Sequence, residues 1–151
     1  MKVLLTCTSI EDTSRTEDSP DSHYPLGLAY LHSYLDKYSE HEVETHFLNN
    51  VNSDICFNKI KSEIEAFKPD VVGISIMTFS RTSSYRMIEY LTQNHPDIKI
   101  ILGGMHPTVM WKNMLKKYTN TIIVVGEGEV TFHELLDCLE EGNDIAEVTG
   151  I

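Results

Sequence analysis

The segment PDVVGISIMT, residues 69–78, decides the fold class of this chain. Its centre, 71–77, is almost continuously apolar, which is typical of a strand buried on both faces of a sheet. The runs VLL at 3–5 and IKIIL at 98–102 have the same character. With two further runs rich in branched residues, these segments predict five strands, at 3–8, 43–48, 71–77, 98–102 and 121–125.

Helical patterns separate the predicted strands. Apolar residues recur at helical spacing in four segments, and a shorter pattern covers 111–118. Pro25 suits the first turn of the first helix, and Pro69 ends the second. Thr131 and Glu134 have the spacing of a capping box at the start of the last helix. The predicted helices contain 28–35, 57–67, 88–91, 111–118 and 132–139.

A regular alternation of strand and helix predicts parallel strands joined by right-handed crossovers. With five strands, we expect an α/β fold with a flavodoxin-like (Rossmann-like) sheet in the order 2-1-3-4-5 and helices on both faces. Ligands of such sheets bind beyond the carboxyl ends of the strands, at the point where the strand order reverses. The loops after the first, third, fourth and fifth strands are therefore the candidate binding loops.

Composition limits the classes of partner. The 151 residues fit one domain, and the net charge of −11 argues against nucleic acid, which proteins bind through a basic face. The three cysteines are scattered and form no CxxC or CxxxCxxC group, so the sequence predicts no zinc or iron–sulfur site and favours a reducing, cytoplasmic location. No run of about 18 apolar residues is present, so we expect no membrane span.

Three binding loops are rich in small residues. Ser75, Met77 and Thr78 follow the third strand, the glycine pair of GGMHPT follows the fourth, and GEGEVT follows the fifth. Glycine lets backbone approach a ligand closely, so these loops suit a bulky ligand on a flat seat, although glycines also serve tight turns as such. GEGEVT is not a dinucleotide fingerprint, because it follows the last strand and lacks the third glycine.

Two other flavodoxin-like functions fit less well. The loop after the first strand, 9–24, has many acids and no glycine, so it makes a poor phosphate nest for FMN or another nucleotide. A phosphorylated receiver domain needs an Asp after the third strand and a Lys after the fifth, and neither is present. The same acidic loop supports an alternative, a regulatory or interaction domain that has lost its ligand.

Four segments in order carry a family resemblance: YPLGLAYLHSYL (24–35), PDVVGISIMT (69–78), IKIILGGMHPT (98–108) and VVGEGEVTFHELL (124–136). Together they resemble the N-terminal cobalamin-binding domain of cobalamin-dependent radical S-adenosylmethionine enzymes. The resemblance implies a domain at 1–143, with DIAEVTGI (144–151) as the start of a linker to a radical S-adenosylmethionine domain. It implies a cobalamin-binding module of a methyltransferase or cyclase that is not catalytic alone. S-adenosylmethionine and a 4Fe-4S cluster would then belong to the absent domain.

The resemblance also implies cobalamin contacts. By position in the motifs these are Ser75, Met77, Thr78, Gly103, Gly104, His106, Gly126, Glu127 and Gly128. No catalytic residue is implied in this part of the chain.

The string DSHYPLG (21–27) is close to the DxHxxG motif, in which other cobalamin carriers supply a histidine to cobalt. Here Gly27 comes one residue late, which turns the following helix by about 100° relative to His23. Pro25 also holds Tyr24 in an extended conformation. We therefore expect cobalamin to be held without a protein histidine and His23 not to be a cobalt ligand.

Overall fold

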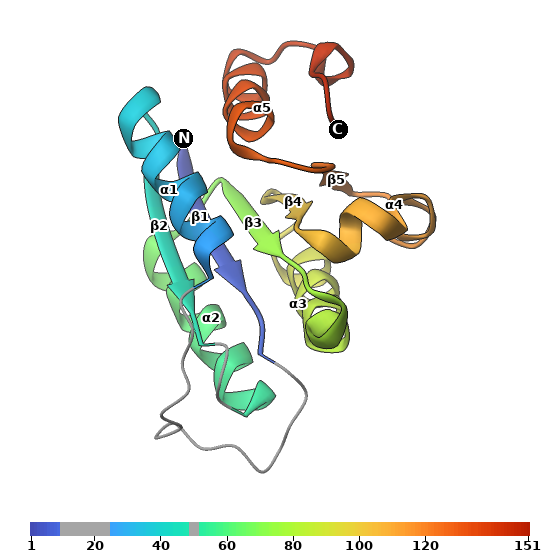
Figure 1. The fold of residues 1–151 in the computed structure, drawn as a ribbon. Helices are drawn as coiled ribbons and strands as arrows, with labels where there is room; N and C mark the ends of the chain where they lie inside the picture. The colour runs from blue at the N-terminus through green and yellow to red at the C-terminus, as the bar shows by residue number, and fades with distance from the viewer. Residues whose placement is uncertain (10–24, 49–51) are drawn as a thin grey trace.

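The computed structural model describes residues 1–9, 25–48 and 52–151 of the chain. Its strands form a single parallel sheet in the order β2-β1-β3-β4-β5 (Figure 1). The predicted flavodoxin-like α/β fold and its strand order are therefore confirmed. The strands are β1 (Lys2–Cys7), β2 (Glu42–Phe47), β3 (Val71–Ser75), β4 (Lys99–Gly103) and β5 (Thr121–Ile123).

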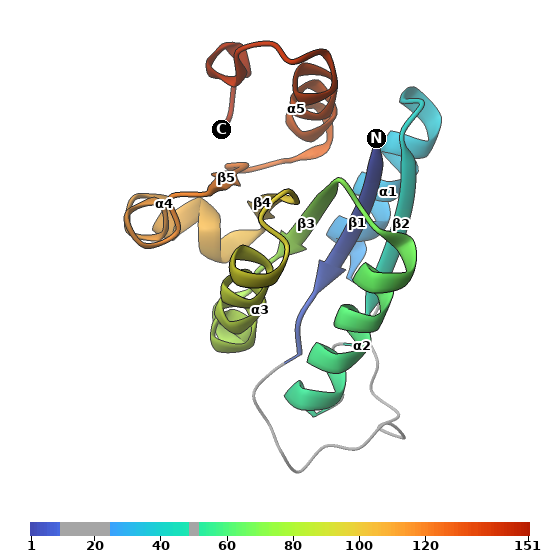
Figure 2. The same ribbon diagram turned by 180° about the vertical axis from the view of Figure 1, so that it is seen from behind.

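Helices cover both faces of the sheet (Figures 1 and 2). One apolar cluster packs α2, α3 and α4 against the sheet, and a second packs α1 and α5 against the other face. None of the described helices is long and apolar enough to cross a lipid bilayer. The helices are α1 (Leu26–Tyr38), α2 (Ser53–Phe67), α3 (Arg81–Asn94), α4 (Met105–Lys117) and α5 (Glu129–Glu141), with short 3-10 helices η1 (Thr78–Ser80) and η2 (Ile145–Glu147).

The register of the strands aligns their carboxyl ends. Cys7 of β1 lies beside Ser75 of β3, and Ser75 lies beside Gly103 of β4. The chain leaves β1 for β2 on one side and returns to β3 on the other, so the connections diverge at this edge. A crevice at such an edge is where ligands of open parallel sheets bind.

Two helix starts differ from the prediction. The fourth helix begins at Met105 rather than near Trp111, because Pro107 lies in its first turn, where a missing N–H costs no intrahelical hydrogen bond. The capping-box prediction is wrong, since α5 begins at Glu129 with Gly128 as its N-cap. Thr131 lies inside this helix, and its hydroxyl donates a hydrogen bond to Thr149 O at 3.1 Å.

The C-terminal segment 144–151 packs against the domain. Ile145 and Val148 contact the apolar cluster under α1 and α5, and Val125 N donates a hydrogen bond to Gly150 O at 2.9 Å. The segment forms the 3-10 helix η2 and a turn. The segment therefore holds the loop after β5 in place from the outside.

Candidate functional site

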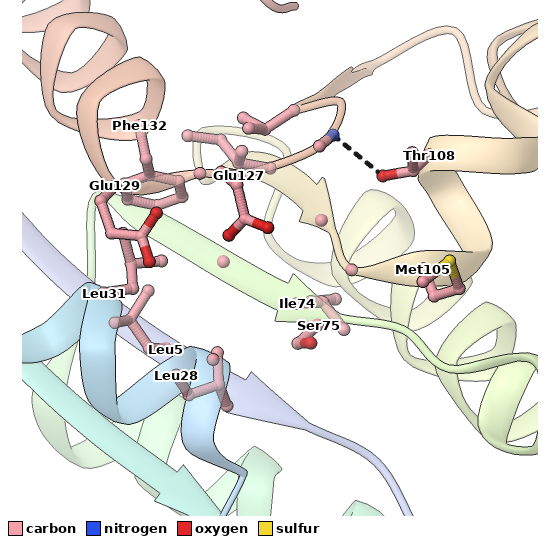
Figure 3. Close-up of a pocket in the computed structure, with 18 residues that line it drawn as sticks. Leu5, Leu28, Leu31, Ile74, Ser75, Met105, Thr108, Glu127, Glu129 and Phe132 are labelled. Atoms are coloured by element: carbon pink, nitrogen blue, oxygen red, sulfur yellow. Dashed lines mark hydrogen bonds between the residues drawn. The ribbon is translucent and has the colours of Figure 1, made fainter.

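A cavity of about 300 Å³ lies beside the carboxyl ends of β3, β4 and β5, on the face of the sheet that α1 and α5 cover (Figure 3). It occupies the expected position of a ligand in this fold. The lining residues come from strands β1, β3 and β4, from three helices, and from the loop between β5 and α5. They are Leu5, Gly27, Leu28, Leu31, Gly73, Ile74, Ser75, Ile101, Gly103, Gly104, Met105, Thr108, Val124, Gly126, Glu127, Gly128, Glu129 and Phe132.

The inner part of the cavity is apolar. Leu5, Ile101 and Phe132 are buried and line it from the sheet and from α5. Between them stands Gly73, where an added Cβ would lie 2.9 Å from Leu5 Cδ2 and 3.1 Å from Phe132 Cζ. The glycine therefore lets the side chains of Leu5 and Phe132 both pack closely against β3, and it leaves the cavity a floor without a side chain at this position.

Glycines form the rim after β4. A Cβ at Gly103 would meet no atom within 4 Å, so this residue leaves open space on the cavity side of the strand. Gly104 has φ +91°, and a Cβ there would lie 3.0 Å from Ile76 O. Gly104 thus permits both the left-handed turn and the close approach of α4 to β3.

The loop between β5 and α5 closes the opposite side of the rim. Gly126, at φ +82°, donates its N–H to Thr108 Oγ1 at 3.1 Å, which ties the loop to α4 (Figure 3). Beyond it, Glu127 and Glu129 line the cavity, and Figure 3 shows the carboxylate of Glu127 pointing into it. Neither carboxylate has an ion-pair or hydrogen-bond partner among the described residues.

The structure brings six of the nine predicted contact residues together. Ser75, Gly103, Gly104, Gly126, Glu127 and Gly128 all line the cavity. Met77 and Thr78 lie just beyond β3 and are exposed, Met77 by 43%, but they are not part of the lining. His106 is not part of the lining either.

His106 is buried between α3 and α4. Its Nε2 shares a hydrogen bond of 2.7 Å with the Tyr85 hydroxyl, and its Nδ1 lies 3.4 Å from Thr78 Oγ1. Its backbone N–H donates to Ile76 O at 3.0 Å. Burial lowers the pKa of His106, and the positive charge of Arg81 lowers it further. The neutral imidazole therefore holds the first turn of α4 against β3 and α3.

This burial predicts a pH dependence of stability. Because the folded-state pKa of His106 is lowered, the unfolded chain binds the proton more tightly. Stability is then fully present above the unfolded pKa of about 6.5 and is lost as the pH falls through the folded pKa. We expect His106→Gln, which cannot take a proton, to lose less stability between about pH 7.5 and about pH 5.5 than the unchanged protein in urea unfolding. Equal losses in the two proteins would contradict the prediction.

Several lining residues were not predicted from the sequence. Thr108 and Glu129 belong to the GGMHPT and GEGEVT segments, so the sequence contained a signal for both. Leu5, Gly73 and Phe132 gave no such signal, because a continuously apolar strand does not show which face carries a cavity. Asp21 and His23 lie outside the described residues.

Comparison with known proteins agrees with this geometry. The B12 binding domain family matches residues 16–136. An uncharacterized methyltransferase of Pyrococcus horikoshii is 32% identical over 84% of the chain, and the anaerobic magnesium-protoporphyrin IX monomethyl ester cyclase of Rubrivivax gelatinosus is 30% identical over 82%. The matches cover 27% and 22% of those proteins, so the chain spans about a quarter of their length.

A solved structure shows the same fold. The radical S-adenosylmethionine methyltransferase TsrM of Kitasatospora setae superposes with a TM-score of 0.79 at 19% identity, over 99% of this chain and 28% of that one. A second TsrM structure, with a TM-score of 0.75, contains cobalamin and a [4Fe-4S] cluster. The family match over most of the chain, on a flavodoxin-like sheet with a cavity at its carboxyl edge, identifies the protein as a member of the B12-binding domain family.

Proposed function

We propose that this domain is the cobalamin-binding module of a radical S-adenosylmethionine enzyme of the methyltransferase or cyclase type. The observation that carries the proposal is the cavity of about 300 Å³, with its apolar floor and glycine rim, at the carboxyl edge of the sheet. Its volume is at the small end of the range for ligand pockets, so it suits one part of a large cofactor. The rest of that cofactor would lie over the rim.

Cobalamin has parts that fit this shape. Its nucleotide tail ends in a flat aromatic base, which suits the floor of Leu5, Gly73 and Phe132. Its corrin is a wide disc, and a disc needs a rim without side chains, as Gly103 and Gly104 provide. We assign the six predicted residues that line the cavity as cobalamin contacts and place Met77 and Thr78 at the edge of the corrin.

His106 has a different role in this proposal. Its side chain is engaged by Tyr85, so it positions the start of α4 rather than contacting the cofactor. Met105 and Thr108, on either side of it in α4, line the cavity.

We also propose that no histidine of the protein binds the cobalt. None of the six described histidines lines the cavity, which supports this proposal. When bound, cobalamin would supply a cobalt centre able to carry an alkyl group, and this chain would bind and orient it. S-adenosylmethionine and a 4Fe-4S cluster would be held by a domain that follows residue 143, with 144–151 as the connection.

Titration with hydroxocobalamin tests the binding function. The visible spectrum reports the cobalt ligands, and Trp111 reports from α4, where its side chain is 41% exposed. We expect saturable binding with a base-off spectrum, because the nucleotide base would be held in the cavity and away from cobalt. The proposal would be overturned if the folded protein showed no binding at hydroxocobalamin concentrations up to about 1 mM. Such a result would mean that the binding free energy is weaker than about −4 kcal/mol.

The variant His23→Ala tests the absence of a histidine ligand. We expect the bound spectrum to be unchanged, because replacing a cobalt-coordinating nitrogen would shift the visible bands. A spectrum that changes in His23→Ala, with cobalamin still bound, would show that His23 coordinates the cobalt.

A further inference from the structure

The charged residues that line the cavity are all acidic. Glu127 and Glu129 line it, and none of the described lining residues is Lys, Arg or His. The protein as a whole carries a net charge of −11, so no general positive potential offsets these two carboxylates. An anionic group placed beside them would be repelled, and a hydrogen-bond donor would be attracted.

The two carboxylates lie in different positions relative to α5. Glu129 is the first residue of α5, where the partial positive charge of the helix N-terminus stabilises an acid. Glu127 lies before the N-cap residue Gly128, outside the helix, and no described residue pairs with it. Its carboxylate points into the cavity (Figure 3). Glu127 is exposed and has no ion-pair or hydrogen-bond partner among the described residues, so its carboxylate is free to contact a ligand at the rim of the cavity.

We infer that Glu127 is a specificity residue, which accepts a hydrogen bond from a neutral carboxamide of the corrin and rejects corrinoids that carry a carboxylate in its place. This inference rests on the proposed binding of cobalamin. The periphery of cobalamin bears carboxamide groups, whose N–H bonds are donors, whereas incompletely amidated or hydrolysed corrinoids bear carboxylates. A charge-assisted hydrogen bond to the amide becomes a contact between two anions when the amide is an acid.

The same charge explains which other ligands the cavity disfavours. FMN and nucleotide polyphosphates would bring phosphate groups against Glu127 and Glu129 without any described lining cation to neutralise them. The single phosphodiester of cobalamin has to lie away from these carboxylates. Apart from Glu127 and Glu129, the described lining residues include no acid.

The test compares two ligands in one protein. The probes are cyanocobalamin and the monocarboxylic acids formed when one of its propionamides is hydrolysed, each titrated at low ionic strength, where charge repulsion is least screened. We expect at least one acid to bind about tenfold more weakly than cyanocobalamin, the change that about 1.4 kcal/mol produces. Because each ratio is measured in one preparation, a loss of folded protein affects both ligands equally.

Single substitutions test whether Glu127 is the residue that discriminates between cyanocobalamin and its monocarboxylic acids. Glu127→Gln keeps the size of the side chain and its ability to hydrogen-bond but removes the charge, so we expect the ratio to fall to within about twofold of unity. Glu129→Gln should reduce the ratio less. Glu134→Gln, an exposed residue of α5 that is not part of the cavity lining, makes the same charge change and should leave the ratio as it is.

Failure of the inference and failure of the proposed function give different results. If cyanocobalamin and hydroxocobalamin do not bind at all, the cobalamin function is wrong and the inference falls with it. If they bind but every acid binds equally well, or if Glu127→Gln leaves the ratio unchanged, only the role of Glu127 is wrong. A ratio that falls equally in Glu134→Gln would assign the effect to net charge and would also overturn it.

Discussion

Replacing Gly103 with leucine is expected to weaken cobalamin binding by roughly 100-fold, equivalent to about 2.8 kcal/mol, while the fold stays intact. Gly103 is the last residue of β4, and it lies on the same side of the strand as Ile101, which lines the cavity. A leucine side chain would therefore project into the space that we assign to the cofactor. The measurement is a titration with hydroxocobalamin, followed by the visible spectrum.

Gly103→Ala is the matched control for this prediction. A Cβ at position 103 meets no atom within 4 Å, and the residue has no positive φ, so alanine adds one methyl group without strain. We expect Gly103→Ala to bind nearly as well as the unchanged protein and both variants to unfold at similar urea concentrations. Normal binding by Gly103→Leu would show that cobalamin does not occupy the cavity.

The fold could be predicted because several sequence signals agreed. Near-continuous apolar runs at 3–5, 71–77 and 98–102 indicated buried parallel strands, and all three lie in the sheet as β1, β3 and β4. The crossover rule then left few arrangements for five strands. The start of α4 was missed because Pro107 indicates a loop when taken alone, although proline is also well tolerated in a first helical turn.

The site was predicted less completely, and helix geometry gives the reason. Met105, His106 and Thr108 are close neighbours in the sequence, but successive residues of a helix point about 100° apart. Met105 and Thr108, three positions apart, share the face toward the cavity, while His106 turns toward Tyr85. Sequence reasoning treated this stretch as a loop, so it had no basis for separating His106 from the lining residues.

The floor of the cavity could not be predicted for a different reason. Leu5 and Ile101 belong to strands that are apolar on both faces, and both faces are covered by helices. The sequence pattern of such a strand is the same whether the covering helix packs directly against it or leaves a cavity between helix and strand. The role of Gly73 is visible only in three dimensions, where its missing Cβ makes room for Leu5 and Phe132 against β3.

Phe132 contributes both to the stability of the fold and to the cavity, so Phe132→Ala is the second substitution for which we expect a large effect. The ring is 4% exposed, it packs between α5 and the sheet, and it also lines the cavity. Phe132→Ala should lower the free energy of unfolding by about 3–5 kcal/mol, out of the roughly 5–15 kcal/mol that such domains have. Urea unfolding with the linear extrapolation measures this loss.

Leu135→Ala separates the two roles of Phe132. Leu135 lies one turn further along α5, is fully buried in the same cluster, and does not line the cavity, so its truncation should cost about 2–5 kcal/mol without changing the site. The two variants are compared without urea, at a temperature where both are folded. We expect only Phe132→Ala to bind hydroxocobalamin more weakly than the unchanged protein, because only this variant removes part of the floor of the cavity. Equal affinities in the two variants would mean that the ring supports the sheet but contacts no ligand, and the tail of the cofactor would then have to lie elsewhere along the carboxyl edge.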